Sequence, residues 1–173
     1  MSTLTQALVI NVAVLFAVLE ADLGPHRKIG PFRLLRPVVL AGTIVPLFAK
    51  ALVTQGDGLR IEVGGTLAGI ACGLAAAGLT HVYRSPRTGR PVSRAGLGYA
   101  ALWVAVAGAR TAFSYGSEHW FSAQLGRWMV RHAVTGDAIT DGLVLMAVAM
   151  TVTRTAALAA RAYGVRRSEP VTA

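Results

Sequence analysis

The stretch IEVGGTLAGIACGLAAAGLTHVY, residues 61–83, decides how the rest of the chain is interpreted. Glu62 is the only residue of this stretch that is an Asp, Glu, Lys or Arg. A helix needs about 20 predominantly apolar residues to cross the ~30 Å hydrocarbon layer of a bilayer. We therefore expect a transmembrane helix here. Four further apolar blocks predict spans of the same kind, at residues 3–19, 37–54, 95–113 and 138–160.

The overall composition agrees with a membrane location. Apolar residues make up 54% of the chain and charged residues only 14%, whereas soluble domains carry about 25% charged residues. We expect an all-α, polytopic membrane helical bundle with five transmembrane helices. It forms a single integral membrane domain over residues 1–173, with a tail at 161–173.

The distribution of basic residues predicts the orientation of the spans. Segments 20–36, 84–94 and 161–173 carry eleven Lys and Arg residues, against three in the two opposite loops. Lys and Arg are enriched in cytoplasmic loops. We therefore expect the N-terminus outside and the C-terminus in the cytoplasm, with the arginine clusters contacting anionic lipid headgroups. Contact with lipid headgroups accounts for the net charge of +9, so we do not expect a nucleic-acid partner.

Segment 114–136 differs from the other loops. Its apolar residues Trp120, Leu125 and Trp128 recur at roughly helical spacing, while charged residues fall largely on other faces. It is too charged to span and too apolar to stay in water. We expect an interfacial helix at the outer surface. An irregular loop with aromatic anchors is the alternative.

Small residues recur every four positions along the central span, at Gly65, Gly69 and Gly73. Such a stripe lets another helix backbone approach closely. Two interpretations stay open, which are packing within the chain and a homo-oligomer seam.

Charged residues inside the spans suggest a ligand site. Lys50 and Arg110 each lie about 20 Å above the cytoplasmic face by helical rise, and Asp141 enters its span near the same level. The geometry permits an Arg110–Asp141 pair with Lys50 partly available for an anion. We predict an outward-facing polar pocket that binds a lipid or a small anionic ligand. Its residues are Lys50, Arg110, Asp141, Glu118, Trp120 and Trp128.

A structural role for the same charges is the alternative. Lys50 and Arg110 can snorkel to the outer interface or close a purely structural ion pair. Arg154, about six residues from the end of its span, is expected to snorkel to the cytoplasmic interface.

The sequence carries no signature of a cofactor or metal centre. No span holds a central histidine for haem, and no ligand spacing typical of zinc is present. The single cysteine, Cys72, cannot form an internal disulfide or a CxxC pair. We expect no cofactor and no catalytic metal.

At Arg84-Ser-Pro-Arg-Thr-Gly-Arg-Pro-Val-Ser-Arg94, followed by Tyr99, Trp103, Arg110 and Phe113, the chain resembles the CcdC-like family. The resemblance covers about residues 60–165. It implies a small multi-pass protein of the bacterial plasma membrane. The family name is associated with cytochrome c maturation loci, but the family offers no established activity or catalytic residues.

Three functions are compatible with these features. The first is a non-enzymatic membrane protein that binds a lipid or small anion, as an accessory subunit of a larger complex. The second is a small membrane enzyme for a lipid or isoprenoid, with Asp141 or Glu118 as the acid and Arg110 as an anion clamp. The third is an oligomeric channel or transporter. The lack of a catalytic signature favours the first.

Overall fold

The computed structural model describes residues 57–86, 89 and 91–167, the strand Gly24–Lys28, and residues 15, 16, 19 and 39. The elements are β1 (Gly24–Lys28), α3 (Asp57–Gly78), β2 (Thr80–Arg84), β3 (Pro91–Ala95), α4 (Leu97–His119), α5 (Ser122–Arg131) and α6 (Gly136–Arg167). This part of the chain is mostly helical, as predicted. The predicted spans 3–19 and 37–54 lie outside the described residues, apart from residues 15, 16, 19 and 39, which are helical.

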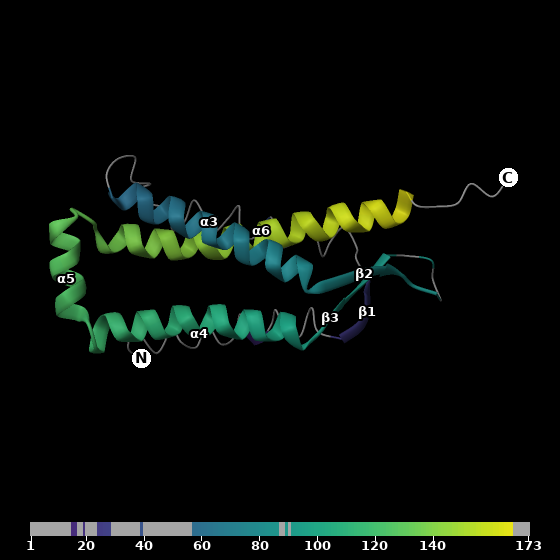
Figure 1. Ribbon diagram of the computed structural model, residues 1–173, viewed down its shortest axis with the longest axis horizontal. Coiled ribbons are helices and arrows are strands. Elements are labelled where there is room, and N and C mark those ends of the chain that lie inside the picture. Colours follow the sequence, from purple (N-terminus) through teal and green to yellow (C-terminus); the bar gives the residue numbers. More distant parts are fainter. Residues whose placement is uncertain are drawn as a thin grey trace.

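Helices α3 and α6 lie side by side and run in the same direction (Figure 1). Their register is set by the glycine stripe of α3. Gly65 packs on the carbonyl of Gly142, Gly69 on that of Met146, and Gly73 on that of Met150. A Cβ atom at Gly73 would lie only 2.6 Å from the Met150 oxygen. Packing within the chain is therefore the interpretation of the stripe that the structure supports.

The ends of these helices follow from local signals. The Thr135 hydroxyl accepts a hydrogen bond from the Ala138 amide (3.2 Å) at the start of α6, as N-cap threonines do. At the end of α3, the Arg161 guanidinium of α6 donates to the carbonyls of Ala77 (2.6 Å) and Thr80 (3.3 Å). A cation at a helix C-terminus satisfies carbonyls that have no partner in the helix.

An antiparallel sheet with strand order β1-β3-β2 stands at one end of the bundle (Figure 1). The all-α prediction is wrong in this respect, and the third span ends at Gly78 rather than Tyr83. Residues 80–84, Thr-His-Val-Tyr-Arg, are β-branched, aromatic or polar, which suits a half-buried strand. Hydropathy extended the predicted third span to Tyr83 because it depends only on the polarity of each residue. It does not detect that residues 80–84 pair with β3, which in turn pairs with β1.

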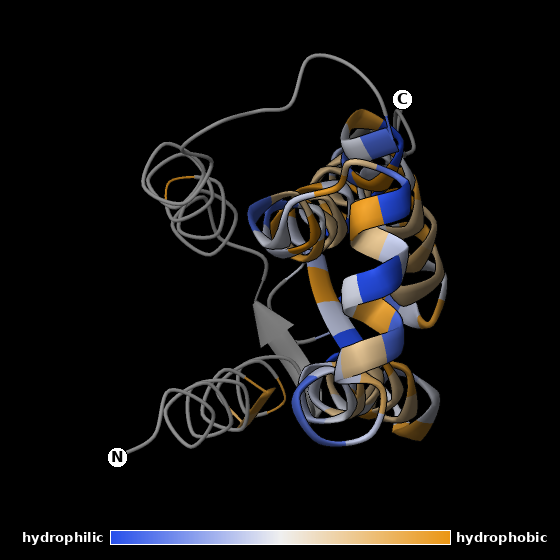
Figure 2. Cartoon of the chain, turned by 90° about the vertical axis from the view of Figure 1, so that its left-hand side faces the viewer, coloured by the Kyte–Doolittle hydropathy of each residue, from blue (hydrophilic) through white to orange (hydrophobic). Residues whose placement is uncertain are grey.

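Helix α5 crosses the opposite end of the bundle, between α4 and α6 (Figures 1 and 2). A helix was predicted within 114–136, and the structure confirms one at Ser122–Arg131. Helix α4 runs six residues beyond its predicted end, to His119. The chain then turns at Gly116, whose carbonyl accepts hydrogen bonds from the amides of Trp120 and Phe121 (2.9 Å each). The Phe121 ring fills the space that a side chain at Gly116 would need.

Within the described residues, two helices are long and apolar enough to cross a membrane, Asp57–Gly78 and Gly136–Val165. Helix α4, which contains most of the predicted span 95–113, is not one of them, so the predicted number of five spans is not supported. In their most apolar stretches only 28% and 22% of the residues are buried, whereas the core helix of a soluble protein is mostly buried. Helix α6 runs to Arg167, seven residues past its predicted span. Its 32 residues correspond to about 48 Å, so its last turns run alongside the sheet.

The glycine contacts predict a sharp difference between neighbouring glycines of α3. Gly69→Ala places a methyl group against the Met146 carbonyl and should push the helices apart, at a cost of about 1–3 kcal/mol. That cost corresponds to a fall of several degrees in the melting temperature of the purified protein. Gly64, with open space around its Cβ position, is the matched control, and Gly64→Ala should not lower the melting temperature. Equal effects at the two sites would contradict the observed packing.

Candidate functional site

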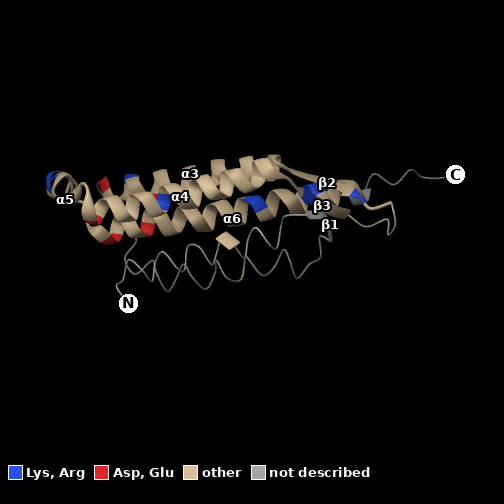
Figure 3. Cartoon of the chain, turned by 90° about the horizontal axis from the view of Figure 1, so that it is seen from below, with Lys and Arg blue, Asp and Glu red and all other residues tan. Residues whose placement is uncertain are grey.

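Acidic residues gather at the α5 end of the molecule (Figure 3). The described acids are Asp57, Glu62, Glu118, Asp137 and Asp141. At the opposite end, around the sheet, the charged residues coloured on the ribbon are basic (Figure 3). Because α3 and α6 are parallel, the acids near the start of each helix come to the same end. The candidate site is therefore this end of the α3–α6 pair.

Two carboxylates at this end are buried. Glu62 and Asp141 are each only 4% exposed. Each lies five residues after the first residue of its helix, a rise of about 7.5 Å. The packing of Gly65 on Gly142 places both carboxylates close to the same helix crossing. Buried ionisable groups in a helix that crosses a membrane are costly and usually functional. Glu62 and Asp141 therefore point to a functional site at this helix crossing.

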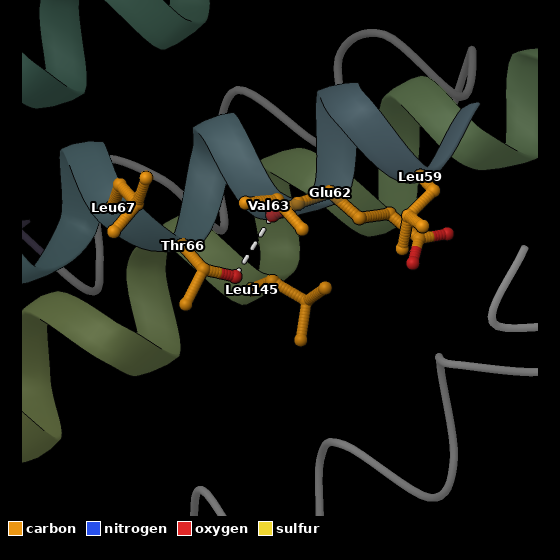
Figure 4. Close-up of a pocket in the computed structure, with 6 residues that line it drawn as sticks. All are labelled: Leu59, Glu62, Val63, Thr66, Leu67 and Leu145. Carbon is orange, nitrogen blue, oxygen red and sulfur yellow. Dashed lines mark hydrogen bonds between the residues drawn. The ribbon is translucent and has the colours of Figure 1, made fainter. Parts of the chain in front are cut away.

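A cavity of about 210 Å³ opens on the same crossing. It is lined by Leu59, Glu62, Val63, Thr66, Leu67 and Leu145 (Figure 4). The Thr66 hydroxyl donates to the backbone carbonyl of Glu62 (2.8 Å). The remaining lining side chains are aliphatic. Leu145 follows Asp141 by one turn and so lies on the same side of α6. The cavity is an apolar recess with a carboxylate at its rim.

Arg110 and Asp141 do not form the ion pair that their depth permits. Arg110 is half-buried on α4, and its Nε atom is buried without a hydrogen-bond acceptor among the described residues. Within residues 57–167 as described, no ion pair links it to Asp141. Helix α4 approaches α6 through Tyr99, near the sheet. Tyr99 precedes Arg110 by eleven residues, or about 16 Å of helix. Depth alone therefore did not determine which charges meet.

The other predicted site residues lie at the bundle end rather than around the cavity. Trp120 is 72% exposed and meets the Tyr115 ring edge-on, with centroids 5.5 Å apart. Trp128 packs against the His132 ring, at 4.9 Å. Glu118 is exposed. Lys50 lies outside the described residues. None of the predicted residues that the structure describes lines the cavity.

The sequence analysis missed the contact that ties α5 to α3. The His132 ring Nδ1 lies 2.9 Å from Asp57 Oδ2, and Arg60 Nη1 donates to Asp57 Oδ1 at 2.8 Å. His132 follows the last residue of α5, and Asp57 begins α3. The two residues are 75 positions apart, so no local pattern relates them. Glu62 as a lining residue could have been found, because Leu59, Val63 and Thr66 recur with it at helical spacing.

The expectation that Arg154 snorkels is wrong. Its side chain is buried, with 9% exposure, and its guanidinium lies over the Tyr99 ring, 5.2 Å from the centroid. Tyr99 is fully buried and also packs against Trp103, at 6.3 Å. A cation over an aromatic face is stabilised by the ring quadrupole. This contact holds α4 against α6 at the sheet end.

The described residues contain no group of three or more His, Cys, Asp and Glu side chains able to hold a metal ion. Comparison with protein-family models, with curated proteins and with solved structures finds no match to this chain. The site is therefore interpreted from its own chemistry.

Two double-mutant cycles should separate the pair that forms from the pair that does not. Asp57→Asn and His132→Gln should be non-additive in melting temperature because their side chains touch, with a small coupling because both are partly exposed. Arg110→Gln and Asp141→Asn should add to within about 0.5 kcal/mol. A strong coupling in the second cycle would show that Arg110 and Asp141 meet after all.

Proposed function

We propose that this chain is a multi-pass protein of the bacterial plasma membrane that binds a lipid at its outer end and catalyses no reaction. The proposal includes five spans, with residues 3–19 and 37–54 as the first two. It also keeps the role of an accessory subunit of a larger complex. The observation that carries it is the apolar cavity beside buried carboxylates on two apolar helices.

The outer face of α3 supports a lipid environment. Large aliphatic side chains recur along it every three or four residues, and each is at least 37% exposed: Leu59, Val63, Leu67, Ile70 and Leu74. They extend over about 22 Å of helix. Contiguous apolar patches of this kind are rare on soluble monomers, and they suit contact with acyl chains.

The positions of the basic segments support the orientation. Strand β1, Arg84 at the end of β2, most of β3 and the last turns of α6 belong to the three Arg-rich segments, and these elements lie at the end away from α5 (Figure 1). Under the positive-inside rule that end faces the cytoplasm. The cavity then opens near the outer surface, and α5 lies in the outer interface.

The lining of the cavity favours a lipid over a small anion. Four of its six residues are aliphatic, and its volume is below the 300–1,000 Å³ of typical small-molecule pockets. It suits part of one acyl chain. Arg110 does not line the cavity, and its Nε, which is buried without an acceptor in the described part of the chain, is proposed as a donor to a phosphate or carboxylate outside the cavity. Lys50 remains a predicted partner for the same group.

A labelling experiment tests the topology. Gly126 in α5 and Gly164 in α6 are exposed, with open space at the Cβ position, so cysteines fit there on a Cys72→Ala background. A membrane-impermeant maleimide should label the cysteine at position 126 in intact cells. It should label the one at position 164 only after permeabilisation. Labelling of position 164 in intact cells would refute the orientation.

Filling the cavity tests the ligand. Leu145→Trp should displace a lipid that co-purifies with the protein, and native mass spectrometry should show its retention fall about tenfold. Leu143→Trp is the matched control, since Leu143 is also half-buried on α6 but does not line the cavity. If both variants keep a stoichiometric lipid, the cavity is not its binding site.

A further inference from the structure

One face of the sheet packs against α6, and on the other face Val92 of β3 is buried while His81 and Arg94 are exposed. On the packed face, Thr80 and Ser93 are each 2% exposed and Ala95 is 6% exposed. Arg84, on the same face of β2, donates to the Val165 carbonyl of α6 (3.1 Å). Residues on adjacent antiparallel strands that pair in register leave the sheet on the same side, and side chains alternate along each strand.

His81 and Arg94 lie on the other face. They are paired in register across β2 and β3, and both are exposed. Directly opposite side chains of this kind have Cβ atoms about 5 Å apart. Neither the His81 side chain nor the Arg94 side chain forms a hydrogen bond or ion pair within the described part of the structure, whose acids lie at the α5 end (Figure 3). The pair therefore presents N–H donors side by side, with no carboxylate beside them among the described residues.

The position of the pair along the chain places it at a membrane surface. His81 follows the last residue of α3 by three positions, and Arg94 precedes the first residue of α4 by three. At about 3.3 Å per strand residue, both lie within about 10 Å of the helix ends. The headgroup region extends about 5–8 Å beyond the hydrocarbon on each side. The pair thus meets the headgroup layer if the helices cross the bilayer.

Strand β1 is the third strand of the same sheet. Its residues pair in register with Ser93 and Val92 of β3. The sheet therefore joins segments that are far apart in the sequence. A loop of the same composition would not hold these positions side by side.

From this arrangement we propose that the β1-β3-β2 sheet binds the phosphate of an anionic phospholipid in the cytoplasmic leaflet, with Arg94 and His81 as its contacts. Arg94 supplies the planar donor pair that matches phosphate oxygens. His81 supplies a neighbouring N–H. The inference rests on the proposed topology but not on the outer cavity, which lies at the opposite end of the molecule.

The test uses the full chain in detergent, with phosphatidylglycerol or phosphatidylcholine added and bound lipid counted by native mass spectrometry. The wild type should prefer phosphatidylglycerol. Arg94→Gln should reduce this preference about fivefold, and the His81→Gln, Arg94→Gln double variant should reduce it further. Both residues are exposed, so folding should be kept, and an unchanged melting temperature checks this.

Arg127→Gln, an exposed arginine of α5 at the other end, is the control and should keep the preference. An equal loss in Arg127→Gln, or unchanged preference in the double variant, would overturn the proposal. Displacement of the lipid by millimolar inorganic phosphate would assign the residues to a soluble anion and overturn it as well. The Leu145→Trp variant should keep the preference, so failure of the outer cavity is distinguishable from failure of this site.

Discussion

The close approach of α3 and α6 is the contact on which the other described elements depend. Without side chains at Gly65, Gly69 and Gly73, the backbone of α3 rests directly on carbonyl groups of α6. Dispersion contacts between backbones stabilise such a pair even where lipid removes the hydrophobic driving force. The contact also fixes the relative depth of the two helices, and with it the level of Glu62 and Asp141 and the position of the cavity.

The ends of this pair are closed in different ways. At the sheet end, arginines of α6 and β2 bind backbone carbonyls across the junction, and Arg154 lies over Tyr99. At the α5 end, a partly exposed contact between His132 and Asp57 closes the bundle. Buried and charge-assisted interactions are stronger than exposed ion pairs. We therefore expect the α5 end to open more readily than the sheet end.

The separation of charge gives the two ends different chemistry. The described carboxylates all lie at the α5 end, together with Arg60, Arg127 and Arg131, whereas the charged residues described around the sheet are basic (Figure 3). A lipid tail in the outer cavity and a phosphate on the inner sheet are therefore two distinct proposals. Both follow from the parallel arrangement of α3 and α6, because it sends the start of each helix to the same side of the bundle.

The sequence by itself determined the two apolar helices α3 and α6 and the helix within 114–136. Length, hydropathy and helical spacing are local properties of the chain, and they predicted α3, α5 and α6, although α3 ends five residues before its predicted end and α6 seven residues after. The stripe at Gly65, Gly69 and Gly73 identified a packing face, although it left the partner open.

Only the tertiary structure decided which residues meet. The strand 80–84 could not be distinguished from a helix end without its partner 91–95, because strand pairing depends on residues distant in the sequence. Arg154 was assigned to the interface by depth, yet Tyr99 offers it an aromatic face on another helix. Arg110 and Asp141 are predicted at a similar depth but do not form an ion pair within the described residues. Depth gives the position of a residue along the bundle, whereas helix packing decides which side chains lie next to each other. The cavity at Leu145 depends on the same packing, so its lining emerged only when α3 and α6 were placed together.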